Sequence, residues 1–437
     1  MTPGDAKPRE PRRDFYPAAF LFALFIAPAA LNLFPLYMED SAQYAGNPEH
    51  LNGLRSIVPG VLALPLYPLL NVWALPVINC AALAAVFLRF FRVFEIEFNY
   101  PRVFVLVLST SIPFYTSFIM PDIWIVVALL CTVMLLVRWR WVDVVLAGVA
   151  IAGHGSNSLI FLALLPIALL LFAGRAKVLA AFGSVLLTSF LVLGPANLAV
   201  THSLFPENFS WSIVGSKILN GVPSALDSLC QVKGGDPICV RRNLMDSAAN
   251  TQHLDDFYIW HSPIGSPEYG GLTREQFNEA GRELLETAIE QHPLALARAT
   301  LLDFAGFYNL RNDHINAYVS PEYAGKDNMQ FILVRDHGLF FDRGWPNKKW
   351  LLVVMYLLNN ATIGLSVFFG ARYFNKLPKL QRQACTLLFC AMVMNDLVFA
   401  FLSGPDMRYH LRVLGVFVPV AMMIYSARQK ALRPEAG

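Results

Sequence analysis

Long apolar runs recur along this chain, and most have about the length that a helix needs to cross a membrane, which is roughly 20 residues. Lipid offers no hydrogen-bonding partner to the backbone, so such runs fold as helices. Of the 437 residues, 15% are charged, whereas soluble domains carry about 25% charged residues. The sequence therefore predicts an all-α polytopic membrane protein.

We expect about ten transmembrane helices. Their predicted ranges are 17–36, 73–92, 103–119, 122–138, 142–154, 157–173, 178–199, 349–370, 384–403 and 411–426. The first run is longer than the core of a secretory signal, and many spans follow it, so we interpret it as an uncleaved span. The apolar stretch 54–70 contains Pro59, Pro65 and Pro68. We interpret it as a re-entrant or interfacial segment, covered by other parts of the protein.

Basic residues in short loops indicate orientation, because they favour the cytoplasmic side. Under the ten-span prediction, every basic cluster falls on one side of the membrane. The clusters are Arg9, Arg12 and Arg13; Arg89 and Arg92; Arg138 and Arg140; Arg175 and Lys177; Arg372, Lys376, Lys379 and Arg382; and Arg428, Lys430 and Arg433. We therefore expect both termini to be cytoplasmic.

This topology divides the chain into three parts. They are an N-terminal transmembrane module at 1–199 with a first exported loop at 37–72, an exported domain at 200–348, and a C-terminal transmembrane module at 349–437. The middle part is long enough to form a small folded domain. We expect that domain to be mainly helical, and to lie in the periplasm if the membrane is a bacterial inner membrane.

Two features of this exported segment can be predicted in more detail. Thr273 is a plausible cap for a helix in "TREQFNEAGRELLETAIEQHP", and a second helix is expected over 294–310. Cys230 and Cys239 also lie here, and an oxidising compartment would allow a disulfide between them.

Polar residues gather on the exported side, beginning with Glu39 and Asp40 in "LYMEDSAQYAG". Charges at a membrane edge are costly and suggest a site. A carboxylate can take a proton from a hydroxyl group, and nearby arginines can hold a phosphate. This pattern is typical of group transfer from a lipid phosphate carrier to an acceptor outside the cytoplasm.

The net charge of +3 is too small to suggest nucleic-acid binding.

Several short motifs, found in order along most of the chain, resemble those of a known protein superfamily. They are "MEDSAQYAG", "RSIVPGVLALPLYPLL", "FIMPDIW" and "SGPDMRYHLRVLGVFVPV". The chain resembles the C-type (GT-C fold) superfamily of membrane glycosyltransferases, which take sugars from polyprenyl phosphates. With "HGSNSLIFLALLP" and "DDFYIWHSPIGS", it is also similar to a group of uncharacterised bacterial membrane proteins. The resemblance implies a GT-C-like fold in a bacterial inner (cytoplasmic) membrane.

The resemblance also implies roles for individual residues. Asp40 would be the catalytic base and Glu39 its helper, while Arg55 and Arg408 would bind the donor phosphate. The residues expected to line the cavity are Tyr44, Asp122, His154 and Tyr409. The sequence predicts no firm cofactor. Glu39 and Asp40 are compatible with a divalent metal, whose requirement the sequence leaves open.

The first hypothesis is thus an inverting glycosyltransferase that moves a sugar from a polyprenyl-phosphate carrier to an envelope lipid or glycan acceptor. Polysaccharide-assembly proteins are the partners that this hypothesis suggests. A lipid or polysaccharide transporter or flippase is the alternative. It predicts charged residues deep within spans, and Asp396 in "VMNDLVFA" fits that prediction. A catalytically inactive GT-C-like assembly scaffold is a third hypothesis.

Overall fold

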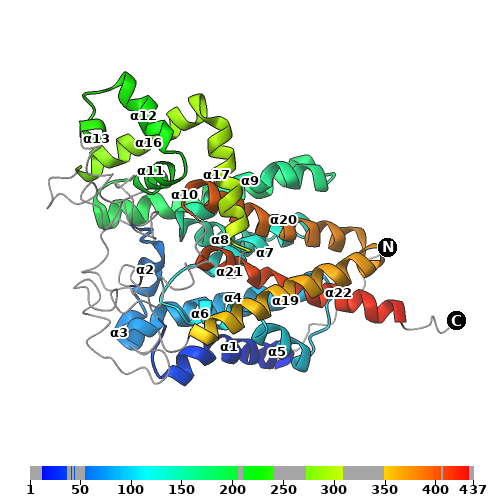
Figure 1. Cartoon of the computed structure of the whole chain (residues 1–437). Coiled ribbons are helices and arrows are strands. Elements are labelled where there is room, and N and C mark those ends of the chain that lie inside the picture. The colour runs from blue at the N-terminus through cyan, green and yellow to red at the C-terminus, as the bar shows by residue number, and fades with distance from the viewer. Residues whose placement is uncertain are drawn as a thin grey trace. The chain divides into compact units, whose positions relative to one another are not determined.

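The computed structural model describes residues 12–36, 41, 44, 55–204, 210–240, 272–308, 349–404 and 407–432. In these ranges the regular structure is helical, and the β-type pairing is an isolated bridge between Leu36 and Phe118. The chain divides into two compact units, here called unit 1 and unit 2. Figure 1 labels the helices. Unit 1 comprises Met1–Leu204, Asn316–Met392 and Leu411–Gly437, and unit 2 comprises Phe205–Ile315 and Val393–His410. The three-part division expected from the sequence stays a prediction.

Unit 1 contains most of the apolar helices. They are α1 (Arg12–Asn32), α2 (Val58–Ala63), α3 (Tyr67–Leu70), η3 (Asn71–Trp73), α4 (Ala74–Val93), α5 (Tyr100–Leu108), α6 (Ile112–Ser117), α7 (Trp124–Val137), α8 (Trp141–Ala152), α9 (Gly155–Leu171), α10 (Arg175–Thr201), α19 (Lys349–Tyr373), η10 (Phe374–Lys376), η11 (Leu414–Val416) and α22 (Phe417–Leu432). Two further helices, α20 (Lys379–Leu402) and α21 (Met407–Val413), belong partly to unit 1 and partly to unit 2.

Helix α7 forms the centre of unit 1. All of its residues from Trp124 to Leu136 are buried, and it packs against α4, α8 and α10. A helix that is apolar on every side is either buried in a protein core or spans a membrane, and the burial of α7 shows that other parts of the protein surround it. Close approach is visible at Gly148 of α8, where an added Cβ would lie 2.6 Å from the side chain of Thr188 on α10.

Five candidate membrane spans occur within the described residues. They are Phe15–Asn32, Tyr67–Val93, Arg175–Thr201, Lys379–Leu402 and Tyr409–Lys430. The chain is therefore an all-α protein with several membrane-spanning helices. The expected count of about ten is not supported, because α7, α8 and α9 are apolar but have only 14, 12 and 17 residues. The type of membrane and the side on which the termini lie stay predictions.

One predicted span is wrong in its local structure. The range 103–119 was expected to be one helix, but it contains the end of α5 and the whole of α6. The hydroxyls of Ser109 and Thr110 donate to Leu106 O and Val107 O, each at 2.9 Å, and Pro113 is the second residue of α6. Side-chain hydroxyls that bond to nearby carbonyls compete with helix continuation, and proline favours a helix start. The broken character predicted for 54–70 is confirmed by the short helices α2 and α3.

Unit 2 has its own apolar core between short helices. These are α11 (Ser210–Gly221), α12 (Pro223–Val232), α13 (Pro237–Val240), α16 (Arg274–Gln291) and α17 (Pro293–Gly306). Ile218, Leu226 and Leu284 are among the buried residues of this core. A disulfide joins Cys230 to Cys239. On the surface, Lys233 pairs with Glu283, and this hydrogen bond raises the pKa of Lys233.

The two helices predicted for the exported segment are confirmed. Thr273 caps α16, because its hydroxyl accepts from Gln276 N at 3.3 Å while Gln276 Oε1 accepts from Thr273 N at 3.0 Å. This reciprocal pair is a capping box. The second helix is α17, which begins at Pro293 and ends at Gly306.

Candidate functional site

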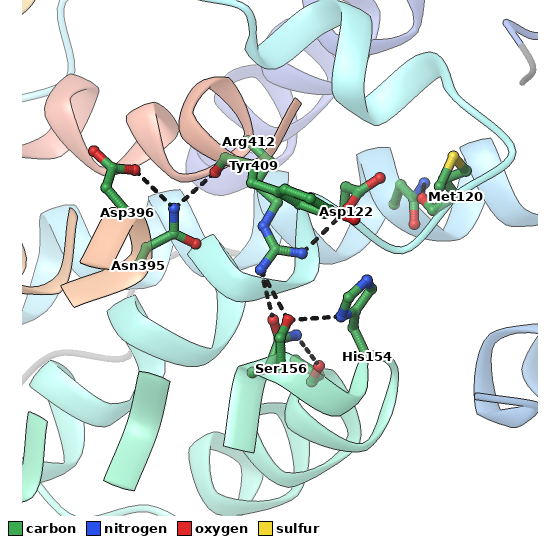
Figure 2. A network of polar contacts seen from close by, with 11 residues as sticks. Met120, Asp122, His154, Ser156, Asn395, Asp396, Tyr409 and Arg412 are labelled. Atoms are coloured by element: carbon green, nitrogen blue, oxygen red, sulfur yellow. Dashed lines mark hydrogen bonds and ion pairs between the residues drawn. The ribbon is translucent and has the colours of Figure 1, made fainter. Parts of the chain in front are cut away.

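The side chain of Arg412 lies at the centre of a polar cluster in unit 1, here called the arginine cluster. Arg412 is completely buried, and its Nη1 donates to Oδ1 of Asp122 at 3.2 Å. Its Nη2 donates to Ser156 Oγ at 3.2 Å and to Asn157 Oδ1 at 3.4 Å. Figure 2 shows the guanidinium pointing toward Asp122 and Ser156. A buried arginine among apolar helices is costly, which makes the cluster a candidate site.

Two helix starts supply the polar partners of Arg412. Asp122 comes just before α7, and Ser156 and Asn157 lie in the first turn of α9. Ser156 Oγ is also 2.8 Å from Nδ1 of His154, the residue that precedes α9. The start of a helix carries a partial positive charge. Arg412 and these two helix starts therefore form a site that favours a negative charge, which Asp122 supplies in this structure.

A second asparagine holds the segment before α7 in place. Asn79 of α4 is buried, and its Nδ2 donates to Phe118 O at 3.2 Å and to Met120 O at 3.0 Å. Its Oδ1 accepts from Trp124 Nε1 at 2.7 Å. These bonds determine the path of the chain on both sides of Asp122. Leu36, which follows α1, forms a bridge with Phe118 of this same segment.

The turn between α8 and α9 packs against the start of α7. A Cβ added at Gly153 would lie 2.3 Å from the indole of Trp124, so only glycine fits at this position. The hydroxyl of Ser56 donates to Ala152 O at 2.6 Å. The segment that carries Arg55, which is half-buried, is thereby attached near His154. The turn is thus positioned from two sides.

The structure brings some of the predicted site residues together. Asp122 and His154 both belong to the arginine cluster, which they join through Arg412 and Ser156. Tyr44 is buried with its backbone N–H bonded to Ser41 O at 3.1 Å. Tyr409 belongs to unit 2, where its ring stacks on Phe399 with centroids 3.7 Å apart.

Other predicted site residues are not located. Glu39 and Asp40 lie outside the described residues, and the side chain of Arg408 is also not described. Their proposed roles stay predictions. Within the described part of the chain, no group of three or more His, Cys, Asp or Glu side chains could hold a metal ion. Whether Glu39 and Asp40 bind a divalent metal, which the sequence left open, is not tested, because both lie outside the described residues.

Arg412, Ser156 and Asn157 were missed as site residues, although they lie in the two motifs "SGPDMRYHLRV" and "HGSNS". The signal was present, since Arg412 lies within the apolar span Tyr409–Lys430. A cation in the middle of a span needs a buried partner. A cation at the edge of a span has less need of one, because its side chain can extend toward water. Arg412 was therefore a stronger candidate than Arg408.

A separate polar network lies in unit 2. Asp396 of α20 is completely buried and accepts hydrogen bonds from Tyr308, Asn395 and His410. Figure 2 shows Asn395 between the Asp396 carboxylate and the backbone oxygen of Tyr409. This acid was the one mid-span carboxylate noted in the sequence. Elsewhere, Arg89 of α4 pairs with the buried Asp143 of α8, and Lys217 of α11 with Asp303 of α17.

The chain is similar to proteins that are named as transporters. Over 164 residues the chain is 24% identical to CMP-sialic acid transporter 2 of Oryza sativa subsp. indica, and equally to that of Oryza sativa subsp. japonica. The alignment covers 36% of this chain and 45% of each relative, so the chain spans less than half the length of the curated relatives it matches. No family model and no solved structure matches the chain.

The glycosyltransferase hypothesis is contradicted by these relatives, which are named as transporters. Their names favour the alternative weighed from the sequence. The buried charges agree with that alternative, because Asp396 and Arg412 lie within candidate spans and are completely buried. The resemblance to the GT-C superfamily and enzymatic activity as such stay predictions, and neither explains the transporter relatives.

Proposed function

We propose that this chain is a membrane transporter for an anionic sugar conjugate, and that Arg412 binds the negative charge of the substrate. The similarity to proteins named CMP-sialic acid transporters supports both the activity and the substrate class. CMP-sialic acid carries a phosphate and a carboxylate, and both are anions that a guanidinium can hold by two parallel hydrogen bonds.

The burial of Arg412 is the structural observation that carries this proposal. A fully buried guanidinium is tolerated only with anionic or polar partners around it. Here Asp122 is the anionic partner, at 3.2 Å, and Ser156 and Asn157 supply neutral oxygens. A substrate phosphate or carboxylate can replace Asp122 at the guanidinium without leaving the arginine unpaired.

The test is uptake of labelled CMP-sialic acid into liposomes that contain the purified protein, with a panel of other sugar nucleotides for comparison. We expect the Arg412→Ala variant to lose at least about tenfold in uptake, because the anion loses its charge partner. Arg412→Lys keeps the charge but not the planar pair of donors. It should retain partial uptake with a higher KM.

Arg89→Lys is the matched control. It makes the same chemical change at another arginine of unit 1, whose partner Asp143 is buried in α8. This variant should transport like the wild-type protein. The proposal fails if the wild-type protein moves none of the sugar nucleotides, or if Arg412→Ala transports as well as the wild-type protein does.

A further inference from the structure

Unit 2 contains an acid and a histidine that are both completely buried and directly bonded. His410 Nδ1 lies 2.8 Å from Oδ2 of Asp396, and neither side chain is exposed to solvent. The hydroxyl of Tyr308 donates to the same carboxylate oxygen at 2.8 Å, and Asn395 Nδ2 donates to Oδ1 at 3.0 Å. The carboxylate is thus surrounded by donors.

The imidazole of His410 is enclosed by aromatic rings. Phe307 stacks on it with ring centroids 6.0 Å apart, and the Tyr308 ring meets it edge-on at 5.1 Å. Nδ1 donates to the carboxylate, while Nε2 is buried and has no hydrogen-bond partner among the described residues. In a neutral ring this nitrogen carries a free lone pair. It is therefore an atom at which a proton can be added.

The charge of the pair changes by one unit when that proton binds. A neutral imidazole beside a carboxylate has a net charge of −1, and an imidazolium beside a carboxylate has a net charge of zero. Burying an uncompensated charge is costly, whereas a neutral ion pair with satisfied hydrogen bonds is tolerated. Acids and histidines within membrane spans therefore mark proton pathways in pumps and transporters.

We propose that Asp396 and His410 form a proton-binding site, and that its proton is the coupling ion for transport. The coupling rests on the proposed transport function, whereas proton binding by the pair does not. Among the described residues, Tyr308 is a further titratable side chain bonded to the pair, and the Tyr409 ring stacks on Phe399. Asp303, which lies on α17 before Tyr308, is paired with Lys217.

A hydrogen-bonded link connects the protonation state to the backbone. Asn395 Nδ2 donates both to Asp396 and to Tyr409 O, the latter at 2.7 Å. An imidazolium at His410 offsets the charge of the Asp396 carboxylate. It thereby weakens the hold of the carboxylate on Asn395, and thus the contact between α20 and the start of α21. The same helix α21 carries Arg412 two residues after His410. Proton binding and anion binding therefore act on one short helix.

The first experiment measures uptake of labelled CMP-sialic acid into proteoliposomes with and without a pH gradient. We expect the gradient to drive accumulation by the wild-type protein. In Asp396→Asn and His410→Gln, accumulation should fall to the level seen without a gradient, while exchange against unlabelled internal CMP-sialic acid continues. Asp227→Asn, which makes the same chemical change on α12 of unit 2, is the control and should accumulate substrate as the wild type does.

The second experiment does not depend on transport. The Tm of the purified full-length protein is measured in detergent at several pH values across the neutral range, in which imidazoles ionise. The wild-type protein and Asp227→Asn should show a step in Tm that Asp396→Asn and His410→Gln lack. An unchanged step in both pair variants overturns the proton site. If the wild type transports but ignores the gradient, the coupling is wrong; if it transports nothing while the step depends on the pair, only the transport function fails.

Discussion

At the scale of single residues, the arginine cluster depends on polar side chains that hold the backbone around it. Asn79 is the clearest case, because one buried amide satisfies the carbonyls of Phe118 and Met120 and the indole N–H of Trp124. These three groups flank Asp122. An unpaired polar group in the protein interior costs about 1–3 kcal/mol, although hydrogen bonds between membrane helices average nearer 0.6 kcal/mol.

We predict that Asn79→Leu destabilises the protein by about 2 kcal/mol, because it leaves these groups without their partner. Denaturant unfolding of the purified protein measures the effect. Uptake should also fall, since the segment that carries Asp122 loses its support. Cys80→Ala is the control on the same helix, where the buried thiol makes only a long contact of 3.8 Å to Thr116 O. Equal stability of Asn79→Leu and the wild type would contradict the prediction.

The sequence identifies residue types at the site better than it identifies pairs. Asp122, His154 and Asp396 are visible as costly polar residues in or beside apolar runs. The partners of Asp122 and Asp396 cannot be recognised in the same way. Arg412 is separated from Asp122 by 290 positions, and His410 is separated from Asp396 by 14. Such contacts depend on how the helices pack against one another, and a local sequence pattern carries no information about that packing.

At the scale of helices, the close approach of α11 and α16 holds unit 2 together. A Cβ at Gly281 would lie 2.0 Å from the carbonyl oxygen of Trp211, and one at Gly215 would lie 2.7 Å from the Cα of Gly281. Both obstacles are backbone atoms, which cannot rotate away. Small residues at such crossings allow helices to pack closely.

We therefore predict that Gly281→Ala separates the two helices and costs about 1–3 kcal/mol, the usual range for overpacking. The Tm of the purified protein is the measurement. Gly235→Ala is the control in the same unit, since a Cβ there meets nothing within 4 Å. An unchanged Tm in Gly281→Ala would show that the crossing is looser than described.

Helices were predictable where their end signals are local. Thr273 and Gln276 mark the start of α16 through a capping box that can be recognised from four residues of sequence. The break between α5 and α6 was not predictable by hydropathy, because Ser109 and Thr110 are tolerated in apolar runs. The helix ends there because their hydroxyls donate to the carbonyl oxygens of Leu106 and Val107, and hydropathy does not show these bonds.

At the scale of the whole molecule, the disulfide bears on orientation. Disulfides persist in oxidising compartments and are rare in the cytosol, so the bond between Cys230 and Cys239 agrees with export of this segment. The other cysteines are Cys80, Cys131 and Cys385, which are buried, and Cys390, which is half-buried.

We predict that a membrane-impermeant maleimide added to intact cells labels the chain only after a reductant is added, and that Cys230→Ser with Cys239→Ser abolishes this labelling. Mass spectrometry of the labelled peptides gives the measurement. Labelling without a reductant would mean that the disulfide does not form in the cell. Labelling that requires cell lysis would place this segment in the cytoplasm.

The hairpin of α7 and α8 has an ion pair at each end. Asp143 at the start of α8 is bonded to Arg89, whereas Asp122 before α7 is bonded to Arg412. An incoming anion that captured Arg412 would release the hairpin at one end only. The bond between Arg89 and Asp143 would stay closed, so the effect of anion binding would be confined to the end of the hairpin that carries Asp122.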